Sequence, residues 1–138
     1  TLQPMVCAAP SYLAEHGEPQ HPSELEGHNC ILWKHPETGR IVPWEFRVRG
    51  RTQSVRGSGS LICGDLDAIA EMAMGGTGLA VIASYRAAPL LASDALREVL
   101  IAYRPPPRNF YLHYPNREFL VQRVRLLVDY LIDHALSE

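Results

Sequence analysis

Histidine and cysteine side chains are concentrated near the start of the chain, and both residue types bind zinc. His16, His21, His28, Cys30 and His35 fall within one short interval. Zinc sites in proteins use ligand pairs at regular short spacings. These five residues match no such spacing, and no second ligand pair follows downstream. We therefore expect no metal and no other cofactor.

Gly76-Thr77-Gly78 has the composition of a phosphate-binding loop, but its position argues against that role. Such a loop follows a strand and precedes a helix, so that the anion meets the positive amino end of the helix. Here the glycines follow a predicted helix and precede a predicted strand. They are interpreted as a helix C-cap and a tight turn.

Two further patterns could support catalysis. Gly57-Ser58-Gly59-Ser60 superficially resembles the nucleophile elbow of serine hydrolases, but its register is wrong and no strand-to-helix turn follows. Asp65 and Asp67 form a carboxylate pair, and helix capping explains both. Acid–base catalysis would require both in a cleft with shifted pKa values. We predict that the protein is not an enzyme.

The chain has 138 residues, is 46% hydrophobic and carries a net charge of −2. These values predict a globular domain with a sizeable core and no strongly basic surface for nucleic acid. Arg47, Arg49, Arg51 and Arg56 come closest to a basic strip, but they alternate with apolar residues. Alternation is typical of a half-buried strand, so we expect the exposed face of a hairpin.

Cys7, Cys30 and Cys63 are an odd number of cysteines, far apart, each in an apolar run. Buried free thiols in a reducing compartment explain them most simply. No signal peptide opens the chain, and no apolar run is long enough to span a membrane. The expected location is the cytoplasm, with no membrane partner.

The hydrophobic pattern predicts an α/β fold. After the predicted strand at 60–63, Asp65 or Asp67 caps a helix. The apolar face of this helix consists of Leu66, Ile69, Ala70 and Ala73. Glycines end the helix, and the buried strand 79–83 follows. This βαβ unit implies parallel strands. The other predicted strands lie at 5–9, 30–33, 43–48, 96–101 and 110–114. The other predicted helical segments are a helix at 11–15 capped by Ser11, a helical turn capped by Ser23, a short helix at 86–91 and a final helix at 117–136.

The strands from 43 to 63 are expected to form a meander. The final helix is expected to pack on its own strand and a neighbouring chain, or to stay partly exposed.

Seven segments, in order, resemble motifs of one known family. They are Ala8–Gly17 ("ASPAYLARHG"), Pro22–Cys30 ("P-x-D-L-x-x-H-x-C"), Trp44–Phe46 ("W-x-F"), Asp65–Tyr85 (helix, "G-x-G-I/L-A" turn and strand), Leu96–Leu100 ("L-V-x-V-L"), Tyr103–Tyr114 ("Y-x-P-P…Y-x-x-Y-P") and Pro115–Leu131 ("R-V-R-x-F-x-D-F-L"). The chain therefore resembles the effector-binding region of LysR-type transcription regulators over essentially its whole length.

The resemblance implies two α/β lobes like those of type-2 periplasmic binding proteins, with a small-molecule effector in the cleft between them. Residues 1–9 are then a crossing strand, 10–103 the second lobe, and 104–138 the return connector with the last strand and helix of the first lobe. The winged-helix DNA-binding segment and most of the first lobe are expected upstream. The implied partners are a small organic anion, further copies of the protein as a dimer or tetramer, DNA only through that upstream segment, and RNA polymerase as a candidate.

Mapped by motif position, the family's effector site falls on Ala9, Pro10, Ile62, Gly64, Asp65 and Thr77. The serine that usually precedes the proline is Ala9 here, so a hydroxyl group that could bind a carboxylate is lost. Backbone N–H groups after Gly64 could instead hold the effector's carboxylate at a helix amino end. Alternatively, Asp65 caps that helix and repels an anion. The sequence leaves both interpretations open.

Two other classes of protein share this architecture. One is the exported solute-binding protein of a transporter, and the other is an enzyme on a similar two-lobe scaffold. An export signal upstream would indicate the first, whereas a helix-turn-helix upstream would exclude the second.

Overall fold

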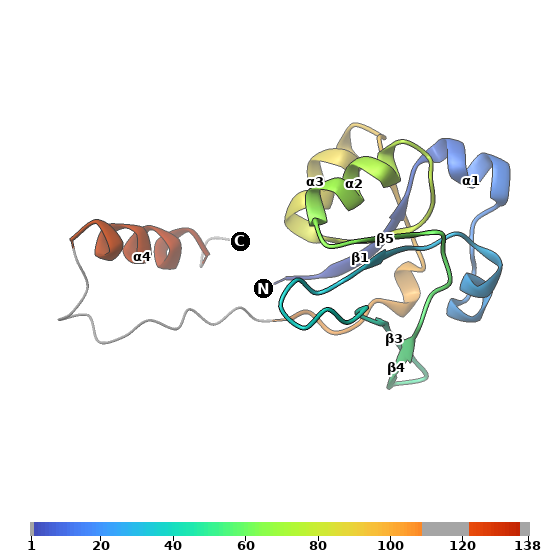
Figure 1. The fold of residues 1–138 in the computed structure, drawn as a ribbon, viewed down its shortest axis with the longest axis horizontal. Helices are drawn as coiled ribbons and strands as arrows, with labels where there is room; N and C mark the ends of the chain where they lie inside the picture. The colour runs from blue at the N-terminus through green and yellow to red at the C-terminus, as the bar shows by residue number, and fades with distance from the viewer. Residues whose placement is uncertain (1, 109–121, 136–138) are drawn as a thin grey trace. The chain divides into compact units, whose positions relative to one another are not determined.

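The computed structural model describes residues 2–108 and 122–135 (Figure 1). The chain divides into two compact units. The larger is Gln3–Pro106, and the smaller comprises Thr1–Leu2 and Pro107–Glu138.

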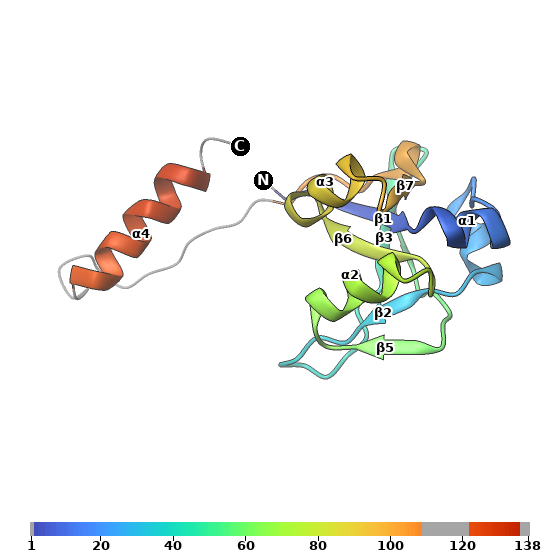
Figure 2. The same cartoon turned by 90° about the horizontal axis from the view of Figure 1, so that it is seen from above.

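A mixed β-sheet is the centre of the larger unit, and its strand order β5-β2-β6-β1-β7 can be followed in Figure 2. β1 is antiparallel to both of its neighbours. β2 and β5 pair in parallel, and the parallel Cys30–Leu79 bridge joins β2 to the start of β6. This arrangement confirms the predicted α/β fold with a βαβ unit. The strands are β1 (Pro4–Ala8), β2 (Ile31–Trp33), β5 (Leu61–Cys63), β6 (Ala80–Ala83) and β7 (Arg97–Val99).

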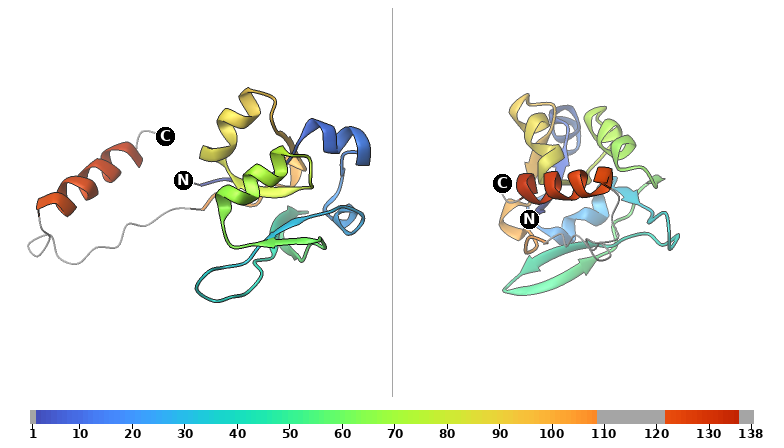
Figure 3. Two further views of the ribbon diagram at one scale, coloured as in Figure 1. Left: turned by 45° about the horizontal axis from the view of Figure 1, so that its top comes forward. Right: turned by 90° about the vertical axis from the view of Figure 1, so that its left-hand side faces the viewer.

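Helices and a hairpin cover opposite faces of this sheet. α2 (Leu66–Met74) and α3 (Ser84–Ala92) lie together on one face, as Figures 1 and 3 show. The hairpin of β3 (Trp44–Val48) and β4 (Arg51–Val55) lies on the other. The remaining helical segments of the larger unit are α1 (Pro10–His16) and the 3₁₀ turns η1 (Pro22–Gly27) and η2 (Ile101–Tyr103).

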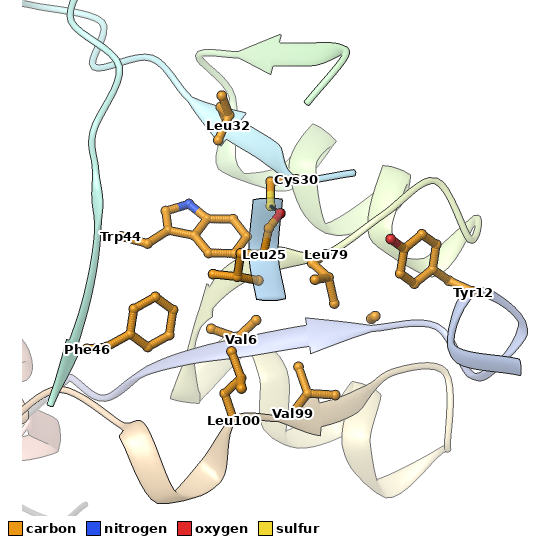
Figure 4. Close-up of a cluster of buried hydrophobic side chains, with 11 residues drawn as sticks. Val6, Tyr12, Leu25, Cys30, Leu32, Trp44, Phe46, Leu79, Val99 and Leu100 are labelled. Carbon is orange, nitrogen blue, oxygen red and sulfur yellow. Dashed lines mark hydrogen bonds between the residues drawn. The ribbon is translucent and has the colours of Figure 1, made fainter. Parts of the chain in front are cut away.

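The core consists of two hydrophobic clusters, because successive side chains of a strand point to opposite faces. Val6 and Ala8 of β1 belong to the cluster under the hairpin, with Trp44 and Phe46. Figure 4 shows this cluster. Met5 and Cys7 belong to the cluster under α2 and α3. The two faces of β1 thus join both halves of the core.

The hairpin presents its arginines to solvent, as predicted. Arg47, Arg49, Arg51 and Arg56 are all exposed, while Phe46 is buried. Arg49 has a φ of 52° and Gly50 a φ of 76°. Two consecutive positive φ values are the signature of the tight turn that matches the twist of paired strands.

The two serine caps were predicted wrongly. α1 begins at Pro10 with Ala9 as N-cap, so Ser11 lies inside the helix. Proline suits the first helical position because its fixed φ is helical and it has no N–H group to leave unpaired. At η1 the cap is His21, whose ring nitrogen accepts a hydrogen bond from the backbone N–H of Ser23 at 3.1 Å.

The predicted meander is also wrong, because β5 pairs with β2 and not with the hairpin. The side chain of Asn29 fixes the start of β5 by accepting a hydrogen bond from the backbone N–H of Ser60 at 3.0 Å. Gly59 permits the approach: a Cβ atom on it would lie 1.7 Å from the carbonyl oxygen of Cys30. Long-range contacts therefore decide this pairing.

Three predicted elements differ in detail. α3 spans Ser84–Ala92 and contains Pro89, so it is longer than predicted. β7 ends at Val99 because Leu100 adopts a left-handed backbone with φ of 56° and leads into η2. On α2, Ile69, Ala70 and Ala73 are buried as expected. Leu66, however, is 44% exposed.

In the smaller unit, Leu2 and Arg108 form an antiparallel bridge through two backbone hydrogen bonds of 2.6 and 2.7 Å. α4 (Gln122–Ala135) confirms the predicted final helix over these residues. Among the side chains of α4 that the structure describes, Leu126, Leu127, Tyr130 and Leu131 are apolar and exposed. The predicted strand at 110–114 and the helix start at 117–121 lie outside the described residues. No helix in the part of the chain that the structure describes is long and apolar enough to cross a membrane.

Candidate functional site

The carboxyl ends of β5 and β6 bring two helix starts to one edge of the sheet. β5 ends at Cys63, and α2 begins at Leu66; β6 ends at Ala83, and α3 begins at Ser84. An ion pair between Asp67 of α2 and Arg86 of α3 links the two starts directly. We call Gly64–Asp67 together with Ser84–Arg86 the carboxyl edge. In open α/β sheets, ligands bind outside the carboxyl ends of the strands.

Asp65 caps α2. Its carboxylate accepts hydrogen bonds from the backbone N–H groups of Asp67 at 2.8 Å and Ala68 at 3.4 Å. The capping interpretation is therefore confirmed, and these two N–H groups are not open to an incoming anion. The carbonyl oxygen of Gly64 also has a partner, because it accepts a hydrogen bond from Nε1 of Trp33 at 3.2 Å.

The start of α3 is bound to both ends of the larger unit. The backbone N–H of Ser84 donates to the carbonyl oxygen of Gln3 at 2.8 Å, and the N–H of Gln3 donates to Oγ of Ser84 at 3.3 Å. The side-chain amide of Gln3 donates to the carbonyl oxygen of Pro105 at 2.9 Å. Gln3 thus ties the carboxyl edge to the segments by which the chain enters and leaves this unit.

Arg86 and Asp67 differ strongly in exposure: the side chain of Arg86 is 29% exposed and that of Asp67 is 77% exposed. The hydrogen bond to Asp67 is the main reason that the pKa of Arg86 lies above its ordinary value. Nε of Arg86 is buried and has no hydrogen-bond partner among the described residues. Tyr85 beside it is 57% exposed.

Ala9, Pro10 and Thr77 lie at the opposite edge. Because β1 is antiparallel to β6, Cys7 near the end of β1 pairs with Ala80 at the start of β6. Ala9 follows directly and is 2% exposed. Figure 2 shows α1 at this end of the sheet and α3 at the other. We call this the amino edge.

The polar groups of the amino edge bind one another. The side-chain amide of Asn29 donates to the carbonyl oxygen of Thr77 at 2.9 Å. The backbone N–H of Asn29 donates to the hydroxyl of Tyr12 at 3.1 Å, and this hydroxyl lies 2.8 Å from Nδ1 of His28. These bonds hold α1, the segment after η1 and the glycine turn together.

The six predicted site residues therefore fall into two groups. Ile62, Gly64 and Asp65 lie on β5 and at the α2 start, with Ile62 53% exposed. Ala9, Pro10 and Thr77 lie beyond the other end of α2, which is about 13 Å long. Gln3, Ser84, Tyr85 and Arg86 were missed. Strand polarity could have revealed the last three, because they directly follow the buried strand 80–83.

In the described part of the chain, the cysteines, the surface hollow and the metal-binding side chains lie outside the carboxyl edge or form no site. Cys7 and Cys30 are free and buried, and burial raises the pKa of their thiols to about 12 and about 11. Cys63 is only half-buried, contrary to expectation. A surface hollow of about 200 Å³, lined by 18–20 and 100–103, shares no residue with the carboxyl edge. Within residues 2–108 and 122–135, no cluster of three metal-binding side chains occurs.

Comparisons with known proteins agree with one another. The LysR substrate binding domain model matches residues 1–136. A putative transcriptional regulator of Pseudomonas aeruginosa is 35% identical over 126 residues, covering 91% of this chain and 41% of the relative. The putative LysR family substrate binding domain-containing protein YagP of Escherichia coli K12 is 27% identical over 104 residues, covering 75% of this chain and 76% of YagP.

Solved structures share the fold. The full-length Vibrio cholerae virulence activator AphB superposes with a TM-score of 0.80 at 23% identity, over 96% of this chain and 45% of AphB. CrgA from Neisseria meningitidis gives a TM-score of 0.77 at 22% identity, over 96% of this chain and 45% of CrgA. The chain spans less than half the length of these regulators. With the family model matching nearly every residue, the chain belongs to the LysR substrate-binding domain family.

Proposed function

We propose that this chain is the effector-sensing part of a LysR-type transcription regulator. It binds a small organic anion at the carboxyl edge and acts by binding, without catalysis. The observation that carries this proposal is the convergence of two helix starts, α2 and α3, at the carboxyl ends of β5 and β6, the two parallel strands on either side of β2. Helix amino ends favour anions, and this is the edge where α/β sheets bind ligands.

Gln3 can transmit a ligand-induced movement of α3 to the segments by which the chain enters and leaves the larger unit. It is bonded to Ser84 at the α3 start and to Pro105 in the segment that leaves the unit. A ligand that shifts α3 therefore shifts both connecting segments. In a whole regulator this would transmit occupancy to a winged helix-turn-helix domain, and so to DNA and RNA polymerase. We place this regulator in the cytoplasm as a homo-oligomer.

The proposed site retains Ile62, Gly64 and Asp65 and adds the start of α3. In this proposal residues 1–9 cross into the lobe 10–103, and 104–138 return to the first lobe. Ala9, Pro10 and Thr77 support the lobe from the amino edge and do not touch the ligand.

Gly64→Trp tests the proposal, because an indole there would obstruct the carboxyl edge. A Cβ atom on Gly64 meets only the carbonyl oxygen of Lys34, at 3.5 Å, which is ordinary contact. Gly27 is the matched control, since a Cβ atom there has nothing within 4 Å. The measurement is the rise in Tm of the chain with acetate, succinate, benzoate or salicylate.

We expect at least one of these acids to raise the Tm of the unsubstituted chain and of Gly27→Trp, but not that of Gly64→Trp. Binding to the native state alone raises stability by mass action. Stabilisation that survives Gly64→Trp would place the ligand elsewhere. The absence of stabilisation by every acid would contradict recognition of a small organic anion.

A further inference from the structure

We propose that Arg86 binds the carboxylate of the ligand, and that Asp67 occupies Arg86 until the ligand displaces it. The proposal rests on the proposed function in one respect, namely that the ligand lies at the carboxyl edge. It adds the residue that recognises the ligand, the competitor that the ligand replaces, and the ligand's chemical class.

The side chains of Arg86 and Asp67 differ in how much of each is packed against the protein. Arg86 lies in the first turn of α3, with 29% of its side chain exposed and its guanidinium 6.0 Å from the ring of Tyr85. Asp67 has 77% of its side chain in solvent. The Asp67 carboxylate can therefore rotate into water at small cost, while the guanidinium stays in place. A ligand carboxylate that replaces it gives Arg86 a new anionic partner.

Asp67 also leaves the guanidinium incompletely bonded. The ion pair runs from Nη1 of Arg86 to Oδ1 of Asp67, whereas Nε is buried without a partner among the described residues. A buried donor without an acceptor costs free energy. Arginine prefers to hold a carboxylate through two parallel N–H groups. A ligand carboxylate reaching Nε and a terminal nitrogen would satisfy this preference.

The surrounding charges permit an anion once Asp67 has moved. The Asp65 carboxylate is engaged with two backbone N–H groups of α2, which offset its charge. The N-cap of α3 is Ala83, and no side chain among the described residues caps this helix. The positive end of the α3 dipole therefore adds to the charge of Arg86.

Each partner of the ion pair is preceded in the sequence by an exposed apolar side chain. Tyr85 precedes Arg86 and is 57% exposed; Leu66 precedes Asp67 and is 44% exposed. An exposed tyrosine ring 6.0 Å from the guanidinium suits an apolar body that carries one carboxylate. We infer an aromatic or branched aliphatic monocarboxylic acid, for which benzoate is the simplest probe.

The test is titration of the ¹⁵N-labelled chain with benzoate, at ionic strength held constant with chloride. We expect a Kd on the order of 1 mM, with the amides of Asp67 and Arg86 shifting. Arg86→Gln should weaken binding by about tenfold or more, because two charge-assisted hydrogen bonds are lost. Asp67→Asn should tighten it about threefold, since removing an internal competitor raises the fraction of binding-competent molecules.

Arg97→Gln is the matched control, because Arg97 also pairs with an aspartate, Asp94 at 3.0 Å, but next to Ala8 at the amino edge. It should leave the Kd unchanged. A purely structural ion pair would make Asp67→Asn and Arg86→Gln weaken binding alike, and that outcome overturns the proposal. Failure of benzoate to bind at about 50 mM also overturns it.

The two proposals can fail separately. If another acid binds, and Gly64→Trp removes its binding while Arg86→Gln does not, the carboxyl edge is the site but Arg86 is not the recognition residue. Benzyl alcohol, which has the apolar ring without the carboxylate, should bind at least about tenfold more weakly than benzoate.

Discussion

Arg104 holds the carboxylate of Glu98 with two nitrogens, Nε and Nη2. The side chain of Glu98 is 8% exposed and that of Arg104 is 41% exposed. Glu98 lies on β7, and Arg104 begins the segment that leaves the larger unit. The pair therefore fastens this segment to the sheet, close to Pro105 and its bond with Gln3.

Removing Arg104 should be costly, because it leaves a carboxylate inside the protein without compensation. We expect Arg104→Met to lower the free energy of unfolding by about 3 kcal/mol. Glu98→Gln, which removes the charge but keeps the shape, should cost less. Urea unfolding of the two variants at neutral pH measures both values. A loss below about 0.5 kcal/mol for Arg104→Met would mean that the pair behaves like an ordinary surface ion pair.

Cys7 should make the protein sensitive to alkaline pH. Burial, and secondarily the nearby charge of Glu98, raises the pKa of its thiol from 9.0 to about 12. The unfolded chain therefore loses this proton first, and stability falls as the pH rises from 9 towards 12. At pH 10 the loss is about 1.4 kcal/mol.

The measurement is the difference in unfolding free energy between pH 8 and pH 10, with a reductant present. Cys7→Ala should show a smaller difference than the unsubstituted chain. Every other titrating group is common to both proteins. Equal pH dependence in the two proteins would show that the Cys7 thiol does not contribute.

Gly78 is required for packing against the backbone of Asn29. A Cβ atom there would lie 2.2 Å from the carbonyl oxygen of Asn29, so Gly78→Ala should cost about 3 kcal/mol or more. In the same turn, a Cβ atom on Gly75 would meet its nearest atom at 3.4 Å. Gly75→Ala should therefore be nearly neutral in thermal unfolding. Similar Tm values for the two variants would refute the steric argument.

Tyr12 joins α1 to the segment before β2. It is 2% exposed, accepts a hydrogen bond from the backbone N–H of Asn29, and lies 2.8 Å from Nδ1 of His28. Tyr12→Phe keeps the ring but leaves the backbone N–H of Asn29 without its acceptor. The free energy of unfolding should therefore fall by about 1–2 kcal/mol. Tyr103→Phe is a suitable comparison at a half-buried ring. If both changes cost the same, the hydroxyl of Tyr12 is not responsible.

The sequence predicted the fold where local pattern and tertiary packing agree. The α2 helix has a carboxylate cap at Asp65, an apolar face and terminal glycines, and all three appear in the structure. The hairpin turn at Arg49-Gly50 is equally local. β5 was assigned to the wrong partner because its pairing depends on Asn29 and Gly59, whose contacts are distant in sequence.

The residues named from the sequence include only part of the site that we propose, for a similar reason. Motif positions led to Gly64 and Asp65, which lie at the carboxyl edge, and to Ala9 and Thr77, which do not. The direction of β1 decides between the two edges, and a sequence pattern does not reveal that β1 runs antiparallel to β6. The position of Arg86 directly after the buried strand is visible in the sequence, but its contact with Asp67 on another helix is not.

Chemical-shift mapping tests the central claim most directly, since both edges carry backbone amides that can be observed separately. The ¹⁵N-labelled chain is titrated with whichever of the four acids raises its Tm most. Binding at the carboxyl edge predicts the largest shifts at Gly64, Asp65, Ser84 and Arg86, with little change at Ala9, Ser11 and Thr77. Largest shifts at Ala9, Ser11 and Thr77 would contradict the account and place the ligand at the amino edge.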